Sequence, residues 1–373
     1  MNINNVAVNQ SKFLLRAFDQ IKDMKPISEI SRLSTSTKLD AMEAISHPKD
    51  FTLRAGMTQR NKIIVAEDIE SKRSVGSYGC NIKDMKVFGR KKTVFYAFDF
   101  TVNEEFRNKS LGKLFINHLN QSVNNEYLKN PDNEPLLFAS TSKSNGSINK
   151  VLGGVEMKEF YDQRQCAWKL DEEMVLPSMH GSQFSVHVYQ EKRLKQVKRQ
   201  WEDNFKSFDM TPYDFNDILV HNNQYYETTY VAQLKKDDKV FGEASISLWN
   251  QDKIFSLKDK KGSSKQHRQL FSCYSNGFEK FFTFDYLLKY VHNDQMRKGV
   301  DYLFGGFAIN DPIIKHFPLV NGIKNLDFTA NVRLNNQQES KLLQKSRDES
   351  TPYFNDPRDY GVVAFHELGK TMV

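Results

Sequence analysis

The sequence predicts a mixed α/β (α+β) protein made of two related halves, and three observations lead to this prediction. Strand-like runs and amphipathic helices follow one another in the order strand, helix, strand in both halves. The chain has 373 residues, enough for two domains of ordinary size. Hydrophobic residues make up 39% of it and 28 residues are Phe, which is ample for packed cores and argues against a disordered protein.

The first half is expected to contain a helical N-terminal segment, residues 1–45, and a domain over 46–180. The N-terminal segment is polar, with an amphipathic helical stretch around Phe13–Met24. In the domain, the run TVFYAFDFTV has the strongest strand pattern of the chain. The expected elements are strands at 62–68, 74–82 and 93–102, a turn at Gly89, a helix opening near Gly112, a strand at 135–141, a helix from Asn145 to Val151 and a closing strand at 168–176.

A junction at 177–183 separates this domain from a second one, expected over 184–373. The second domain opens with a basic helix, in which Leu194, Val197 and Trp201 form the apolar stripe at i, i+3 and i+7. The elements expected after it are strands at 225–234, 240–249 and 302–309, a helix over 282–299 that ends at Gly299, and a polar surface helix or loop over 335–351.

The net charge of +7 is small for this length and is spread along the chain. Its densest cluster lies on the basic helix, at Lys192, Arg193, Lys195, Lys198 and Arg199. Two interpretations stay open: a solvated helix face at the domain junction, or a contact with an acidic partner such as an acidic protein. Aromatic residues are not interleaved with the basic ones, so no nucleic-acid platform is expected.

Cysteine usage and hydropathy point to a globular protein of a reducing compartment, expected to be the cytoplasm. The three cysteines, Cys80, Cys166 and Cys273, lie far apart, so neither a disulfide framework nor a Cys-based zinc site is expected. No HExxH or CxxC motif occurs, and no metal is expected. No apolar run approaches the roughly 18–20 residues of a membrane helix, and no secretory signal is recognised at the N-terminus.

The junction FDFTVNEEFRNKSLGKLF has the features of an anion-binding site. A strand runs into a short loop that opens a helix, and the first N–H groups of a helix are free to bind an anion. Small residues allow close approach, and Arg107, Lys109 and Lys113 supply positive charge. A diphosphate suits this arrangement, although neither a Walker A motif nor GxGxxG is present. An ordinary strand-to-helix turn with solvated basic residues is the alternative.

The run from Arg107 to Gly112 resembles the acetyl-CoA pyrophosphate loop of the GNAT acetyltransferase superfamily, whose pattern is R/Q-x-x-G-x-G/A. The segments before it, VAED, VGSYGCNI and the strand ending FTV, fit the same superfamily. Downstream, PLLFASTSKSNGSINKVLG resembles its next strand and helix. In the second half, GEASISLWNQDKIFSL, DYLFGGFAINDPIIKHFP and FNDPRDY resemble, in order, tandem-GNAT proteins similar to the plant hookless-type N-acetyltransferases.

The resemblance implies two tandem GNAT-like domains, each a mixed twisted sheet flanked by helices, and transfer of an acetyl group from acetyl-CoA to an amine acceptor. The CoA thioester would lie where parallel strands separate after the strand at 93–102. The residues implied are Phe100, Thr101 and Val102 for the thioester carbonyl, Arg107, Asn108, Lys109, Ser110, Leu111, Gly112 and Lys113 for the pyrophosphate, and Asn145 for the pantetheine arm.

The sequence departs from the family pattern at two positions that bear on activity. Ser110 replaces the first loop glycine, and Leu152 stands where the family often has a Tyr that acts as general acid. Asp99 is the candidate general base, although it is also interpreted as a solvent-facing residue of an alternating strand. Glu67 is a weaker candidate of the same kind. His118 is expected to be a surface or packing residue.

Two alternatives to an acetyltransferase remain. One is a catalytically degenerate GNAT-fold protein that serves as a structural or interaction module in a larger, for example cytoskeletal, assembly. The other is an acyl-CoA-binding regulator that transfers nothing. The second half has no R/Q-x-x-G-x-G loop, so it is expected to lack a cofactor of its own and to shape the acceptor groove or dock a partner.

Overall fold

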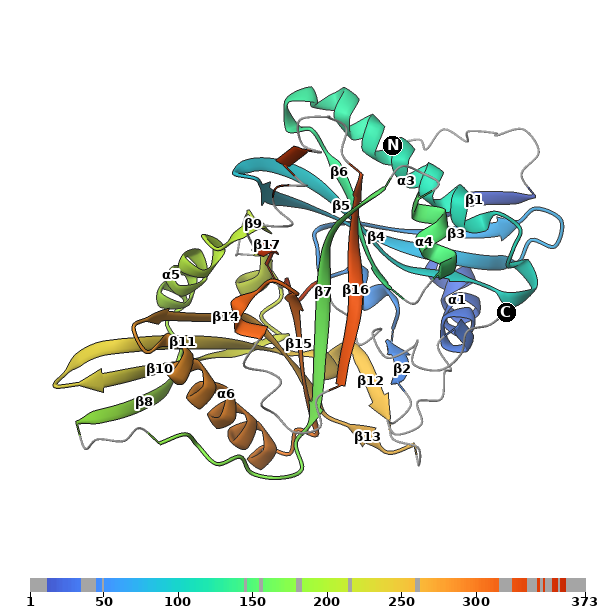
Figure 1. The fold of residues 1–373 in the computed structure, drawn as a ribbon. Coiled ribbons are helices and arrows are strands. Elements are labelled where there is room, and N and C mark those ends of the chain that lie inside the picture. Colours follow the sequence, from blue (N-terminus) through green and yellow to red (C-terminus); the bar gives the residue numbers. More distant parts are fainter. Residues whose placement is uncertain are drawn as a thin grey trace.

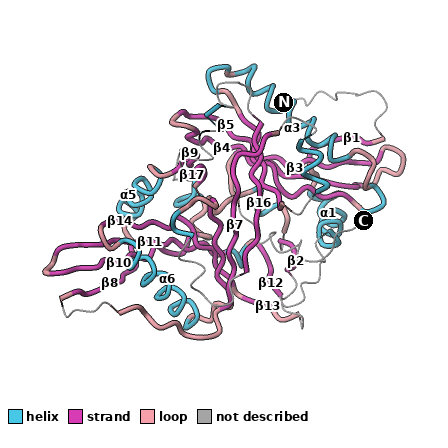
Figure 2. The backbone as a smooth tube through the Cα atoms, viewed as in Figure 1, coloured by secondary structure: helices cyan, strands magenta, loops and turns pink. Residues whose placement is uncertain are grey.

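The structure is a computed structural model, and its largest feature is one mixed β-sheet that runs through both halves of the chain. The described residues are 12–34, 45–48, 50–143, 146–153, 157–178, 183–213, 217–258, 262–314, 324–333, 341–342, 345, 351–354 and 356–359. Among these residues, a 14-stranded sheet and a small 3-stranded sheet are formed. Figure 2 shows the strands as a continuous layer with helices on both of its faces.

The first half contains strands β1, β3, β4, β5, β6 and β7 of the large sheet. Its elements are β1 (Phe13–Ala17), α1 (Gln20–Ser34), β2 (Ile45–Pro48), α2 (Thr52–Ala55), β3 (Arg60–Asp68), β4 (Ser74–Val87), β5 (Arg90–Val102), η1 (Glu104–Phe106), α3 (Leu111–Lys129), η2 (Pro131–Asn133), β6 (Leu136–Ser142), α4 (Gly146–Gly153) and β7 (Lys158–Lys169).

The second half repeats this succession of elements. They are β8 (Phe184–Glu191), α5 (Leu194–Phe205), β9 (Phe208–Pro212), η3 (Asp217–His221), β10 (Tyr226–Lys236), β11 (Lys239–Asn250), η4 (Gln251–Lys253), β12 (Phe255–Lys258), β13 (Ser264–Lys265), β14 (His267–Gly277), α6 (Lys280–Arg297), β15 (Tyr302–Ala308), β16 (Lys324–Arg333) and β17 (Thr351–Tyr353).

The strands of the large sheet occupy matching positions when they are counted inward from its two ends. Their order is β1-β3-β4-β5-β6-β16-β7-β15-β14-β11-β10-β8, so each first-half strand has a counterpart in the second half. A parallel pair occupies the matching place in each half, β5 with β6 and β14 with β15. The predicted mixed α/β architecture of two related halves is therefore confirmed, and the halves share a single sheet.

The two central strands are exchanged between the halves. β7 is the last strand of the first half but pairs with β15 of the second half, and β16 belongs to the second half but pairs with β6 of the first. Figure 1 shows β7 and β16 side by side through the middle of the molecule. Because β16 lies among first-half strands, the domain limits 46–180 and 184–373 do not separate two independent sheets, and they stay a prediction.

Several sequence-based elements are corrected by the structure. Residues 13–17, expected to be helical, form β1, which pairs antiparallel with β3. The helix begins only at Gln20. The edge of β3 offers hydrogen-bond partners that outweigh local helix propensity. The closing strand, expected at 168–176, is β7 and already ends at Lys169. The second half, expected to open with the basic helix, opens with strand β8. Most of 335–351 lies outside the described residues.

The hydrophobic cores lie on both faces of the sheet. One core packs α3 and α4 against the first-half strands, and a matching core packs α6 against the second-half strands. On the opposite face, two further clusters lie where the halves meet, and they contain the buried Trp201 and Trp249 as well as Tyr353 and Phe354. The C-terminal residues are therefore part of the packing between the halves.

Candidate functional site

A bulge in strand β5 is the first feature of the candidate site. Asp99 and Phe100 of β5 together lie opposite the single residue Tyr78 of β4. Asp99 has φ +51°, in the left-handed region that few residues other than glycine adopt. Such bulges re-aim side chains and are frequent beside active sites, and residues in costly conformations gather there as well.

The parallel strands β5 and β6 separate just before this bulge. Their pairing extends from Val94 with Leu136 to Ala97 with Ala139 and goes no further within the described strands. β5 continues to Val102, whereas β6 continues to Ser142 with pairing to β16 alone. The predicted separation thus begins inside the strand at 93–102, and the main chain of Phe100 to Val102 lies beyond the last β5–β6 pair.

The loop after β5 leads to an exposed helix N-terminus. Asn108 and Ser110 both have left-handed backbones, with φ of 60° and 62°. Ser110 is the N-cap of α3 but its hydroxyl caps no N–H of the helix. Residues 107–110 are exposed, and so is Lys113. The position of the missing family glycine therefore has the conformation that glycine favours, and Ser110 adopts it at a conformational cost.

Gly112 lies in the first turn of α3 and is required neither by packing nor by its backbone. A Cβ placed there would approach Val151 Cγ2 at 3.6 Å, an ordinary van der Waals contact. Glycine inside a helix costs about 0.5–1 kcal/mol relative to alanine. A glycine without a structural need at a helix N-terminus fits close approach of a ligand to the backbone.

The remaining predicted cofactor residues lie around the bulge and the helix. Thr101 is buried, and its Oγ1 lies 3.0 Å from Ser77 Oγ. Phe100, Val102 and Leu111 all belong to or pack against the core beneath α3. Asn145 lies outside the described residues. Leu152 is fully buried in the same core, so no hydroxyl is available at that position.

Aromatic residues fill the space between the bulge and α3. The ring of Tyr78 stacks on Phe100 at 5.4 Å and meets Phe115 edge-on at 5.2 Å. The Tyr78 hydroxyl lies 2.7 Å from His118 Nδ1, and burial raises the pKa of Tyr78 well above its ordinary value. Burial also lowers the pKa of His118. His118 is therefore a packing residue with a hydrogen-bonding role.

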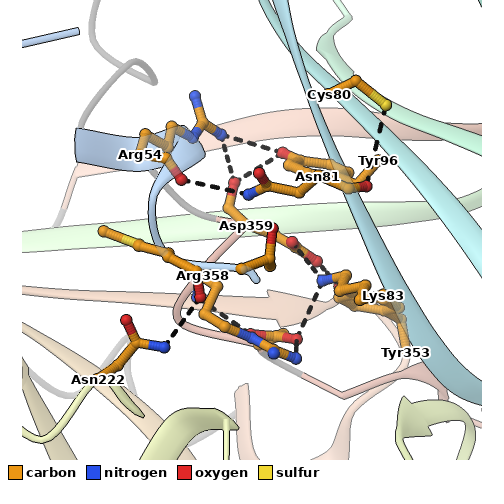
Figure 3. Close-up of polar contacts among 12 residues, drawn as sticks. Arg54, Cys80, Asn81, Lys83, Tyr96, Asn222, Tyr353, Arg358 and Asp359 are labelled. Carbon is orange, nitrogen blue, oxygen red and sulfur yellow. Dashed lines mark hydrogen bonds and ion pairs between the residues drawn. The ribbon is translucent and has the colours of Figure 1, made fainter. Parts of the chain in front are cut away.

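Asp99 points away from this aromatic cluster and pairs with Arg54. The Arg54 Nη1 donates to Asp99 Oδ1 at 2.6 Å, and a quarter of the Asp99 side chain stays exposed. The Arg54 guanidinium is buried and lies 4.6 Å from the centre of the Phe98 ring. Figure 3 shows Arg54 beside Tyr96 and Asp359, to which it also donates.

Glu67 is placed apart from Asp99 by the structure. It lies on β3, two strands from β5. Lys22 and Arg16 donate to its Oε2 at 2.5 and 2.8 Å. The hydrogen bond from Lys22, and then that from Arg16, hold the pKa of Glu67 below its usual range although burial opposes this. An ionised carboxylate already shared by two cations is poorly suited to accept a proton, and its predicted role remains untested.

The second half contains the same bulge. Ser272 and Cys273 of β14 together lie opposite Ile246 of β11, and Ser272 has φ +47°. The parallel pairing of β14 with β15 also ends early, at Leu270 with Gly305. The strand geometry of the two halves is therefore closely matched.

The loop after the second bulge is closed. Only Phe278 and Glu279 separate β14 from α6, and Glu279 N donates to Phe241 O at 3.1 Å. A Cβ on Gly242 would lie 2.3 Å from Thr283 Oγ1 and 2.9 Å from Glu279 O. The first turn of α6 thus packs directly on β11 through Glu279 and Thr283, which leaves no loop between strand and helix comparable to residues 103–110.

Three further findings concern the described residues. They contain no group of three His, Cys, Asp or Glu side chains that is arranged to hold a metal ion. None of their helices is long and apolar enough to cross a membrane. The three cysteines are free and buried, and burial raises the pKa of Cys80 and Cys166 to about 12, which leaves them poor nucleophiles.

The basic helix of the sequence analysis is α5. Lys192, Arg193, Lys195 and Arg199 are exposed on or beside it, and Arg193 pairs with Glu191 at 2.8 Å. Val197 and Trp201 are buried, as the apolar stripe predicts, whereas Leu194 is half exposed. The acidic partner of this surface stays a prediction.

Known structures share this arrangement, although sequence comparisons find no relative. No protein-family model matches the chain, and no curated protein matches it. Saccharomyces cerevisiae N-myristoyltransferase with bound myristoyl-CoA has a TM-score of 0.56 at 13% identity, covering 87% of this chain and 83% of that one. The chain has the GNAT fold. A GCN5-related N-acetyltransferase from Sphaerobacter thermophilus likewise has a TM-score of 0.56 at 10% identity, covering 88% and 97%.

The comparisons confirm the coarse part of the predicted resemblance. The GNAT-fold neighbours cover most of this chain, and the large mixed sheet flanked by helices agrees with that fold. The tandem arrangement and the finer assignment to the hookless-type branch stay predictions. Sequence reasoning missed Arg54 and the C-terminal residues around Asp359, although the motif FNDPRDY had already marked the second of these.

Proposed function

We propose that the protein transfers an acetyl group from acetyl-CoA to an amine, and that transfer takes place in the first half. The observation that carries the proposal is the succession of three features along one segment. A bulge at Asp99 and Phe100, a separation of parallel strands and an open helix N-terminus at Ser110 follow each other directly. Together they offer a place for a thioester and, next to it, a place for a pyrophosphate.

The loop residues would bind the diphosphate of CoA. Helix N-termini attract anions through free N–H groups and the helix dipole. Arg107, Lys109 and Lys113 add positive charge around the first turn of α3, and Gly112 leaves the backbone accessible. The acyl-CoA supplies an activated acyl group as its thioester, and main-chain N–H groups of Phe100 to Val102 would polarise its carbonyl.

The aromatic cluster favours a short acyl group. Tyr78, Phe100 and Phe115 pack closely beneath the bulge, and the Tyr78 hydroxyl is tied to His118. A long acyl chain that entered the core at this point would have to displace these rings. Interiors packed to this density tolerate extra methylene groups poorly, at about 1–3 kcal/mol for overpacking. Acetyl is therefore proposed ahead of myristoyl.

Asp99 is proposed as the group that accepts the proton of the amine. The amine nitrogen forms a bond with the thioester carbonyl carbon, the carbon–sulfur bond breaks, and the amine proton passes to Asp99 and then to solvent. Leu152 offers no proton for the leaving thiolate. Thiols are much stronger acids than alcohols or amines, with a pKa of about 8.5 for cysteine, so a thiolate leaves without a general acid at modest cost. Loss of the family tyrosine is thus compatible with transfer.

Isothermal titration tests the donor proposal directly. The wild-type chain is expected to bind acetyl-CoA and CoA, and to bind myristoyl-CoA at least tenfold more weakly. Arg107→Glu and Lys113→Glu are expected to reduce affinity about tenfold each, because each reverses a charge beside the phosphates. Lys280→Glu is the matched control, since Lys280 begins α6 in the closed second-half loop. Absence of binding at millimolar acetyl-CoA would overturn the proposal and favour a non-catalytic module.

A further inference from the structure

The C-terminal motif FNDPRDY is built into the wall of the first-half site. We call its described part, residues 354 and 356–359, the C-terminal strap. The strap follows β17, which pairs parallel with β9, and β9 in turn pairs with β4. Phe354 packs on Phe205 and Phe208 of the second half, with ring centroids 4.4 and 5.7 Å away. The strap therefore connects both halves across the face on which Asp99 lies.

Buried charges fix the strap to the first half. Lys83 Nζ donates to Asp356 Oδ2 at 3.0 Å and also to Asp359. Arg358 pairs with Asp356 at 2.6 Å, and all four side chains are almost completely buried. Tyr353 donates from its hydroxyl to Asp359. Charges buried in this way are costly to separate, so the strap has one defined position. Figure 3 shows this network of residues.

The main chain of the strap holds Arg54. The carbonyl oxygen of Asp359 accepts from Arg54 Nη2 at 2.5 Å and from the Tyr96 hydroxyl at 2.6 Å. The other terminal nitrogen, Nη1, donates to Asp99 Oδ1 at 2.6 Å. Because a guanidinium is planar and its donors form a rigid fork, a bond on one side fixes the direction of the other. The strap thus orients Arg54, and Arg54 orients Asp99.

We propose that Arg54 is a positioning residue for Asp99 and that the C-terminal strap holds it in place. The proposal rests on the proposed acetyl transfer. Asp99 is a quarter exposed on a bulge, and Arg54 is the side chain that pairs with it. With Oδ1 held by Arg54, Oδ2 is left for the incoming amine, and it has no hydrogen-bond partner among the described residues. The FNDPRDY motif thereby acquires a role in the first-half site.

Kinetics of Arg54 variants test the proposal with acetyl-CoA and a primary amine as probes. Arg54→Met is expected to lower kcat at least tenfold while KM and Kd for acetyl-CoA stay within threefold, because the loop is untouched. Arg54→Lys keeps the charge and loses the fork, so it should recover only part of kcat. Arg164→Met is the control, since Arg164 forms a more exposed arginine–aspartate pair with Asp327 at 2.9 Å on the central strands.

A second variant covers the case in which Arg54→Met does not fold. Tyr96→Phe removes one of the two donors on the Asp359 carbonyl and keeps the ring, and it should lower kcat two- to fivefold. Unchanged kcat in both Tyr96→Phe and Arg54→Lys would overturn the positioning role, with acetyl transfer intact. A wild-type chain that binds no acetyl-CoA would overturn the proposed function itself, which the titration detects separately.

Discussion

The two halves of the chain contain the same strand bulge and differ in the segment that connects it to the next helix. In the first half, residues 103–110 form a loop with two left-handed residues, and the first turn of α3 is open. In the second half, Phe278 and Glu279 alone connect the strand to α6, which packs on β11 at Gly242. The bulge is thus compatible with either a binding site or a closed core, and the loop decides between them.

The difference also extends to the side chains at the two bulges. Asp99 is partly exposed and pairs with Arg54, whereas Ser272 is buried and accepts from Asn204 Nδ2 at 3.3 Å. A carboxylate on the surface of a bulge can exchange protons with a substrate. A buried hydroxyl bonded to an amide cannot, so the second bulge is a structural element.

The largest expected effect distinguishes the two bulges by rate. Asp99→Asn should lower the transfer rate about 100-fold, the usual contribution of a general base, with acetyl-CoA affinity almost unchanged. Ser272→Ala, at the matching position, should leave the rate within twofold. Steady-state kinetics with titration of acetyl-CoA measures both. Equal losses in the two variants would show that the bulges act through stability and not through chemistry.

Replacement of glycine by alanine is expected to change stability in opposite directions at the two helix N-termini, at Gly112 in α3 and at Gly242 of β11, on which α6 packs. Gly242→Ala should destabilise the protein by about 1–3 kcal/mol, because its Cβ would meet Thr283 and the Glu279 carbonyl. Gly112→Ala should stabilise by about 0.5–1 kcal/mol, since the position is helical and has room. It should also weaken acetyl-CoA binding. Denaturant unfolding measures the two changes in stability. An unaltered affinity of Gly112→Ala for acetyl-CoA would show that Gly112 does not lie at the phosphate site.

The conformation of Ser110 predicts a smaller gain. Ser110→Gly should raise the free energy of unfolding by about 0.5–1 kcal/mol, because it removes a left-handed residue that carries a Cβ. The substitution also restores the glycine of the family pattern, so acetyl-CoA should bind more tightly. Chemical denaturation and titration check the two parts. A loss of stability would mean that the Ser110 hydroxyl makes a contact that outweighs the backbone cost.

The smallest effect concerns one histidine in the helix after each bulge. Burial lowers the pKa of both His118 in α3 and His292 in α6. Near pH 6 the unfolded chain therefore binds more protons than the folded chain. The stability that the two histidines contribute is complete above about pH 6.5 and is lost as the pH falls through their lower pKa values in the folded state. His292 should contribute more than His118 to this loss of stability, because its Nδ1 accepts from Trp168 Nε1 at 3.3 Å and protonation removes that acceptor.

Thermal unfolding between pH 7 and 5.5 measures this effect. The melting temperature should fall by about 1–2 °C, and His292→Asn should reduce the fall more than His118→Asn does. A melting temperature that rises on acidification would contradict the sign derived from the burial of these side chains.

Local features of the fold were predictable from the sequence, and long-range ones were not. The strand at 93–102 and the basic helix follow from periodicity, and the loop at Arg107–Gly112 follows from its residues. The place of β16 between β6 and β7 does not, because strand exchange depends on partners that are far apart in the chain. Likewise β1 obtains its conformation from the edge of β3.

The candidate site divides in the same way. Asp99 and the loop residues form one contiguous segment, so a family pattern could identify them. Arg54 and Asp359 approach Asp99 from opposite ends of the chain, and no local pattern pairs residues separated by such distances. The left-handed backbone of Asp99 was equally out of reach, since strand alternation predicts an extended residue there.

The most direct test of the central claim is a crystal structure of the full chain grown with acetyl-CoA. One acetyl-CoA per chain is expected, with its pyrophosphate on the main chain of Ser110 to Lys113 and its thioester beside Phe100. The second-half loop at Phe278 and Glu279 should bind none. Acetyl-CoA on the second half, or a chain that stays unliganded at millimolar acetyl-CoA, would contradict the claim that the loop after the bulge decides which half binds the donor.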